Sequence, residues 1–168
     1  DQVITYVGNC LFQEELYTAS IRMFNYLIKK YPHSDRIPEA LLGLEKAYYN
    51  QRKYKQTLRV YYVILKKTND KKILSEACYW AGQSHHLLKN YDMAINVLKK
   101  IDSHSDYYDV ALYTTALSYL KKSNVAISVD YFRKITALPL ISAERRKVVD
   151  DARLTCLLYT SRAHETSL

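Results

Sequence analysis

The feature that most constrains the fold of this chain is an internal repeat. Apolar and small residues recur in one pattern at spacings of 37, 37 and 34 residues. Within each unit the pattern follows the 3.6-residue period of a helix, breaks at a short polar stretch and resumes as a second helix. The sequence therefore predicts four helix–turn–helix units, near residues 1–36, 37–72, 73–106 and 107–140.

The second helix of each unit shows the repeat most clearly. A small residue is followed four positions later by a bulky one, in the pairs Ser20–Phe24, Thr57–Tyr61, Ala94–Leu98 and Ser128–Phe132. The small residue lets two helices approach, and the bulky one fills the gap to the next unit. Because no single unit can bury its apolar face alone, the stacking of neighbouring units must supply the core.

A last helix is expected after the fourth unit, and Ser142 is suited to cap its start. The apolar pattern continues there at Val148, Val149, Ala152, Cys156 and Tyr159. We predict one all-α domain over residues 1–160, with a capping helix at 142–162 and a tail at 163–168. Only three glycines and three prolines occur, which disfavours a turn-rich β fold. No apolar run approaches the ~18 residues that a membrane span needs.

Several of these positions match a known repeat family. The first helices place an apolar residue before glycine at Val7-Gly8 and Ala81-Gly82, and Pro32 closes the first unit. Together with the small and bulky positions of the second helices, these residues resemble the tetratricopeptide repeat family over nearly the whole chain. Glu45 departs from the pattern because it replaces the glycine of the second unit. The resemblance implies a right-handed α–α superhelix whose first helices line a concave binding face.

The resemblance also implies which residues contact a partner. They occupy first-helix positions displaced from the core stripe, namely Asn9, Phe12, Lys46, Tyr49, Asn50, Tyr79, Gln83, His86 and Tyr113. Family positions place Leu42 on the same face. The mixture of aromatic rings, amides and a lysine suits a peptide or a helix of a partner protein. We therefore expect a protein-interaction scaffold that binds no small-molecule substrate.

No motif for catalysis is present. The triplets His33–Asp35 and His104–Asp106 contain the residue types of a catalytic triad, but contiguous residues cannot reproduce its spatial arrangement. The three glycines lie far apart, so no phosphate-binding loop is formed. We predict that the chain is not an enzyme and holds no cofactor.

A metal site is not predicted either. His85 and His86 are adjacent, so on a helix their side chains point about 100° apart. We expect His85 to be a hydrogen-bonded histidine in the core or at its edge. The cysteines Cys10, Cys78 and Cys156 form no CxxC pair, which disfavours both a zinc site and a disulfide framework.

Two stretches bear on the cellular compartment. Tyr31–Ser34 and Glu76–Gly82 resemble the degenerate repeats of bacterial cell-envelope proteins, such as outer-membrane assembly lipoproteins. This likeness implies a periplasmic scaffold in envelope assembly or integrity, with peripheral membrane attachment through an anchor upstream of Asp1. The widely spaced cysteines favour a reducing compartment instead, so the cytoplasm remains the alternative.

The charge leaves further alternatives open. With 25 Lys and Arg against 17 Asp and Glu, the net charge is +8. Nucleic acid or another anionic surface is therefore an alternative partner. Most basic pairs, however, end helical runs, where cations complement the helix dipole, and this placement disfavours nucleic acid. A third alternative is an accessory domain of a larger multidomain protein.

Overall fold

The computed structural model describes residues 1–138, 147–155, 157 and 158, and in this part of the chain all regular structure is helical. The helices are α1 (Gln2–Gln13), α2 (Tyr17–Lys30), α3 (Ile37–Asn50), α4 (Tyr54–Lys67), α5 (Lys71–Leu87), α6 (Tyr91–Leu98), α7 (Tyr108–Lys121) and α8 (Val125–Thr136). Residues 147–155, 157 and 158 are helical too, so the described part of the expected capping helix forms. Its proposed cap Ser142, together with Cys156, Tyr159 and the tail at 163–168, lies outside the described residues.

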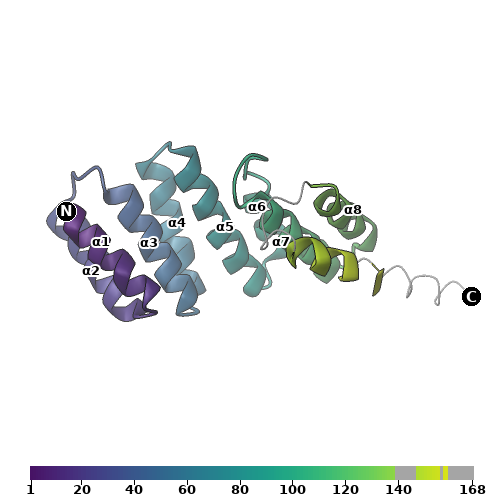
Figure 1. Cartoon of the computed structure of the whole chain (residues 1–168), viewed down its shortest axis with the longest axis horizontal. Helices are drawn as coiled ribbons and strands as arrows, with labels where there is room; N and C mark the ends of the chain where they lie inside the picture. The colour runs from purple at the N-terminus through teal and green to yellow at the C-terminus, as the bar shows by residue number, and fades with distance from the viewer. Residues whose placement is uncertain (139–146, 156, 159–168) are drawn as a thin grey trace, which may run out of the picture.

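The helices follow one another in a single row (Figure 1). Each packs against the next from α1 to α8, which confirms the predicted stack of helical hairpins. Among the described helices, the first helices of successive repeats also contact one another directly, as α1 with α3, α3 with α5 and α5 with α7. The second helices do not contact one another in this part of the chain. The row is therefore tighter on the side of the first helices, which form its inner, concave face.

The turn inside each repeat is built in the same way four times. A residue with positive φ stands just before the second helix, in the order Glu15 at 59°, Arg52 at 59°, Lys89 at 63° and Ser123 at 60°. These four residues are separated by 37, 37 and 34 positions, the same spacing as the repeat units. None is glycine, although the left-handed conformation is less favourable for residues with a Cβ by roughly 1 kcal/mol or more. The packing of the two helices therefore imposes the turn.

Among the helices α1–α8, side chains cap the starts of α1 and α5. Asp1 and Asp70 accept backbone hydrogen bonds at the starts of α1 and α5. Neither Ser34 nor Asp35 caps α3, whose N-cap is Arg36 and has no side-chain cap bond. The Ser34 hydroxyl instead accepts a hydrogen bond from the Arg36 amide at 3.1 Å, which closes the loop before the helix.

The core runs along the row between the helix pairs. One apolar cluster extends from α2 to α7, and a second joins α7 and α8 to Val149 and Ala152 of the capping segment. Val7 and Leu65 follow the apolar pattern of the repeats but are exposed at 36% and 39%. No helix among the described residues is both long enough and apolar enough to cross a lipid bilayer.

Candidate functional site

The inner face carries five aromatic rings, which we call the inner row: Phe12, Tyr49, Trp80, Tyr79 and Tyr107. Tyr49 on α3 packs against Trp80 on α5, with ring centroids 4.9 Å apart. Trp80 meets the neighbouring Tyr79 at 4.9 Å, and Tyr79 meets Tyr107 at 5.1 Å. All five side chains are half-buried, so each ring contributes both to the packing of repeats and to the surface.

A charged pair joins this row at its middle. The ammonium of Lys46 lies 2.9 Å from the Glu76 carboxylate and 5.4 Å from the centroid of Phe12. Trp80 donates its indole N–H to the same carboxylate at 3.4 Å. Glu76 therefore connects α3 and α5, and it balances the lysine charge on this face.

Two polar contacts connect the next pair of first helices, α5 and α7. Gln83 donates to the Thr114 hydroxyl at 2.7 Å, and Nδ1 of His86 lies 2.8 Å from the Ser118 hydroxyl. The Ser118 hydroxyl already donates its proton to the Thr114 carbonyl. The proton between His86 and Ser118 therefore belongs to His86 Nδ1, which leaves Nε2 as an acceptor.

Burial favours the neutral forms of the Tyr49 and His86 side chains. Desolvation raises the pKa of Tyr49 to about 12, with smaller contributions from Tyr79 and Tyr54. Desolvation lowers the pKa of His86, and the nearby charge of Lys121 lowers it further. At neutral pH the inner face therefore offers uncharged rings and hydrogen-bonding groups beside one compensated ion pair.

The structure groups most, but not all, of the predicted binding residues. Phe12, Lys46, Tyr49, Tyr79, Gln83 and His86 all lie on the inner face and take part in the contacts above. Asn9 lines a separate hollow of about 150 Å³ with Arg36 and Glu39. Asn50 is exposed but donates back to the Lys46 carbonyl of its own helix at 2.9 Å. Leu42 is buried at 9% exposure and so belongs to the core.

Tyr113 lies apart from the inner row. Its ring packs against Phe132 of α8, with centroids 5.9 Å apart, within the second apolar cluster.

Three residues of the site were not among the predicted contacts: Glu76, Trp80 and Tyr107. The single tryptophan beside Tyr79 was a usable signal, whereas nothing in the sequence marks Glu76 as the residue that connects two helices.

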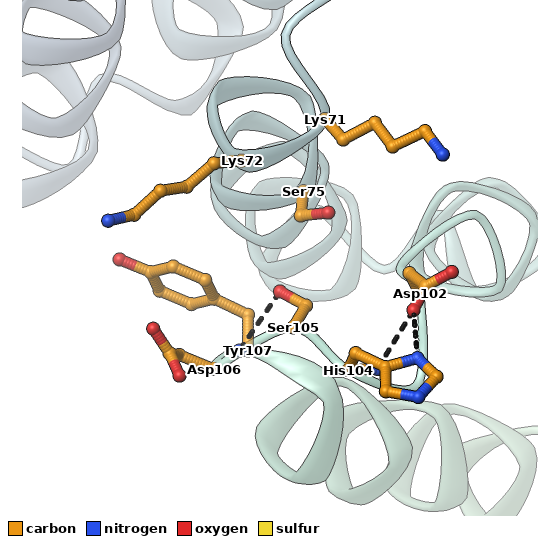
Figure 2. Close-up of a pocket in the computed structure, with 8 residues that line it drawn as sticks. All are labelled: Lys71, Lys72, Ser75, Asp102, His104, Ser105, Asp106 and Tyr107. Carbon is orange, nitrogen blue, oxygen red and sulfur yellow. Dashed lines mark hydrogen bonds and ion pairs between the residues drawn. The ribbon is translucent and has the colours of Figure 1, made fainter.

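A pocket adjoins the end of the inner row (Figure 2). It has a volume of about 530 Å³ and lies between the start of α5 and the loop that leads into α7. Lys72 and Tyr107 lie on one side of it, and Lys71, Asp102 and His104 on the other (Figure 2). Since the Tyr107 ring also packs against Tyr79, the pocket and the inner row share one wall.

The pocket does not contain a catalytic triad. His104 bonds Asp102 at 2.9 Å rather than Asp106, and both groups are largely exposed. Ser105 accepts a hydrogen bond from the Tyr107 amide at 3.3 Å. These contacts shape the loop before α7. Over the described residues, no group of three or more His, Cys, Asp or Glu side chains could hold a metal ion.

The prediction that His85 is hydrogen-bonded is wrong. The side chain is buried at 6% exposure, but neither ring nitrogen has a hydrogen-bond partner among the described residues. Cys78, which shares its helical face, contacts the Tyr61 hydroxyl at 3.6 Å. Burial lowers the pKa of His85, so its ring is held neutral in the core.

Comparison with solved structures identifies the fold. The sequence matches no model of a known protein family, and no curated protein sequence matches it significantly. MamA 41-end from Desulfovibrio magneticus RS-1 has a TM-score of 0.72 at 16% identity, over 98% of this chain and 93% of that one. A tetratricopeptide repeat protein from Parabacteroides merdae ATCC 43184 has a TM-score of 0.71 at 15% identity, over 92% of this chain and 60% of that one. The chain therefore has the predicted right-handed superhelical fold of tetratricopeptide repeats.

Proposed function

We propose that this chain is a non-enzymatic scaffold that binds a peptide or a helix of a partner protein along the inner row. The observation that carries the proposal is the contact chain from Tyr49 through Trp80 and Tyr79 to Tyr107, with every ring half-exposed. The superhelical fold supports it, because a curved stack presents an extended concave surface to its partners.

The chemistry of the inner row suits apolar side chains of a partner. Aromatic rings bury a large area, and these rings are already held in place by one another, so binding orders few additional side chains. Lys46 is compensated by Glu76, which leaves little net charge to steer a phosphate backbone. We infer that the partner presents aromatic or aliphatic side chains to the inner row. Backbone groups beside them can form hydrogen bonds with the tyrosine hydroxyls of the inner row and with His86 Nε2.

The test uses peptides selected from a random library on the immobilised chain. Peptides that bind the inner row should lose affinity by about tenfold or more on Tyr49→Ala, because truncating a central aromatic residue typically removes about 2 kcal/mol or more. Tyr26→Ala is the matched control, since Tyr26 is a half-exposed tyrosine on the second helix α2. Fluorescence anisotropy at fixed protein concentration gives both affinities. Equal losses in the two variants, or none in Tyr49→Ala, would rule out the inner row.

Salt separates this proposal from the nucleic-acid alternative. Basic pairs lie in the last turns of α2 and α4, at Lys29-Lys30 and Lys66-Lys67, away from the inner row. Binding of single-stranded DNA through them would weaken steeply as salt rises, whereas peptide binding on the inner row should change little. Reversal of Lys99 and Lys100 should likewise leave peptide binding nearly unchanged.

A role in the bacterial cell envelope is part of the proposal. It is supported by the likeness of Tyr31–Ser34 and Glu76–Gly82 to repeats of envelope proteins. We propose a periplasmic location on this basis. Fractionation of cells that express the complete gene tests it: recovery in the cytoplasm would exclude the envelope role while leaving protein binding intact.

A further inference from the structure

The pocket at the end of the inner row is built by two irregularities of the repeat. The repeat spacing carries the start of α3 at Ile37 onto Leu74 and then onto Tyr108, where α7 does begin. Helix α5 instead begins almost one turn earlier, at Lys71. The loop into α7, residues 99–107, is longer than the loops before α3 and α5. The early turns of α5 form one wall of the pocket, and this loop forms the other, below α5 in Figure 2.

A buried hydroxyl on the α5 wall has no partner. Ser75 lines the pocket and is 8% exposed. Elsewhere on the first helices, the buried Ser84 and Ser118 donate to the carbonyl four residues earlier. The Ser75 hydroxyl makes no such bond, nor any other among the described residues. Because buried polar groups are nearly always hydrogen-bonded, this hydroxyl calls for a partner within the pocket.

The charges around the pocket balance. It is lined by two ammonium groups, of Lys71 and Lys72, and by two carboxylates, of Asp102 and Asp106. Hydrogen bonds from the backbone amide and the ring of His104 lower the pKa of Asp102, so this carboxylate is ionised at neutral pH. A ligand carboxylate would meet two like charges here, and so would a ligand ammonium group. A neutral group that carries both donors and acceptors suits the pocket better than either.

The two walls differ in what they offer such a group. Lys72 and Ser75 are three positions apart on α5, so they share a face of the helix, and both can donate a hydrogen bond. Asp106 on the loop wall can only accept one. Lys72 and Asp106 lie on the same side of the pocket, beside Tyr107 (Figure 2). Among the described residues, neither Lys72 nor Asp106 forms an ion pair.

We propose that this pocket binds the side-chain amide of an asparagine or glutamine in the partner peptide. The amide oxygen accepts hydrogen bonds from Lys72 and Ser75, and the amide nitrogen donates to Asp106. A hydroxyl group has its donor and acceptors on one atom, whereas an amide places them on two atoms that can face the two walls. The inference rests on the function proposed above, because the pocket shares Tyr107 with the inner row, so that a peptide bound there can continue into it.

The probes are peptides selected from a random library on the immobilised chain. We expect Asn or Gln to be enriched at a position beyond the apolar residues of the selected peptides. Two synthetic versions replace a Gln at this position. Met keeps the length without the amide, and Glu keeps the shape with a negative charge; for an Asn the matched pair is Leu and Asp. Each version should bind the wild type about tenfold more weakly in fluorescence anisotropy, because the polar groups of the pocket lose a partner or meet a like charge.

Asp106→Lys tests the assignment from the side of the protein. It replaces the acceptor of the loop wall with a donor and leaves three ammonium groups against Asp102. The acidic version of the peptide should therefore gain about tenfold or more relative to the amide version. Asp35→Lys is the matched control, because Asp35 is the exposed residue at the equivalent position of the loop before α3 and undergoes the same change of charge. It should leave the preference for the amide unchanged.

Tyr49→Ala distinguishes failure of this inference from failure of the proposed function. If Tyr49→Ala weakens binding but Asp106→Lys leaves the amide preference unchanged, the pocket assignment is overturned and the inner row remains the binding surface. If only Asp106→Lys acts, the pocket is an amide site and the inner row is excluded. Enrichment of a charged residue at the selected position, or equal binding of the three peptide versions, would also overturn the assignment. A library that yields no binding peptide would overturn both proposals.

Discussion

The helix crossing of the first repeat differs from that of the second, although both use equivalent positions of the sequence. In the first repeat, a Cβ on Gly8 would lie 2.6 Å from the ring of Phe24, so glycine leaves the room that the ring fills. The hydroxyl of Ser20 reaches across and donates to the Gly8 carbonyl at 2.9 Å. The fourth repeat has the same hydrogen bond, from Ser128 to the Ala116 carbonyl at 2.9 Å.

In the second repeat a glutamate occupies the position of Gly8. Glu45 is fully buried, and neither carboxylate oxygen has a hydrogen-bond partner among the described residues. The hydroxyl of Thr57, which is equivalent to Ser20, donates to the Lys53 carbonyl of its own helix at 3.3 Å. The comparison teaches that the fold accepts a large acidic residue at a crossing, with loss of the hydrogen bond between the helices.

The largest expected effect tests how far the tight crossing of the first repeat supports the stack. Phe24 is fully buried and lies between Gly8 of α1 and Gly43 of α3. Phe24→Ala should lower the free energy of unfolding by about 3–5 kcal/mol, because it removes a large ring and leaves a cavity. Urea denaturation followed by circular dichroism gives the value. Tyr26→Ala on the same helix, at a residue 51% exposed, should change it little. A similar small change in both variants would show that the first crossing is not packed.

The third repeat tests whether a crossing tolerates an added side chain. Gly82 faces Leu98 there, and the small residue Ala94 is fully buried. Ala94→Leu should destabilise the chain by about 1–3 kcal/mol, since overpacking a dense core forces side chains off their preferred positions. The melting temperature reports the change. A melting temperature equal to that of the wild type would mean that Ala94 does not lie at a tight contact.

Much of this architecture could be predicted from the sequence because periodicity and spacing encode it. The paired helices are confirmed by the structure, and the small positions Ser20, Thr57, Ala94 and Ser128 are all buried. The turns gave no local signal, because residues such as Glu15 and Arg52 adopt positive φ only under the constraint of the packed helices. A pattern of polar and apolar residues indicates which face of a helix is buried, but it does not indicate the dihedral angles of a three-residue link.

The site was less predictable for a related reason. Helical spacing grouped Tyr49 with Tyr79, and both rings contact Trp80, but spacing alone cannot tell which neighbours a side chain contacts. The role of Glu76 depends on the distance between α3 and α5, which is set by the whole stack. Likewise, Glu45 could be recognised as a departure from the pattern, but its burial without a partner is a property of the packed repeat.

The pH dependence of stability tests the glutamate of the second crossing directly. Desolvation raises the pKa of Glu45 well above its usual value, and the charge of Glu76 adds to the shift. The folded chain therefore keeps this proton at a pH where the unfolded chain has lost it. Stability from this group is complete below the unfolded pKa of about 4.3 and is lost as pH rises through the folded pKa.

Glu45→Met removes the titrating group at similar volume. It should raise the free energy of unfolding at neutral pH by about 1–3 kcal/mol, the usual penalty for a buried polar group without a partner. The gain should shrink as the pH falls towards 4.3 or so. Urea titrations of the wild type and of Glu45→Met, from acidic to neutral pH, give the difference in unfolding free energy at each pH. Because the buried His85 is present in both proteins, the effect of its protonation cancels in this difference. A gain that is constant with pH would contradict a protonated Glu45.

The smallest expected effect concerns the hydroxyl groups that distinguish the two crossings. Ser20→Ala should lower the free energy of unfolding by about 0.5–1.5 kcal/mol, because it removes a hydrogen bond in the buried crossing between α1 and α2. Thr57→Val keeps the shape of the side chain and removes only a bond within α4. Since the Lys53 carbonyl retains its helical hydrogen bond from the Thr57 amide, this change should have a smaller effect than Ser20→Ala. Urea denaturation of the two variants under identical conditions gives the comparison. Equal losses of unfolding free energy would contradict this expectation. The hydrogen bond of Ser20 between α1 and α2 would then stabilise the chain no more than the bond of Thr57 within α4.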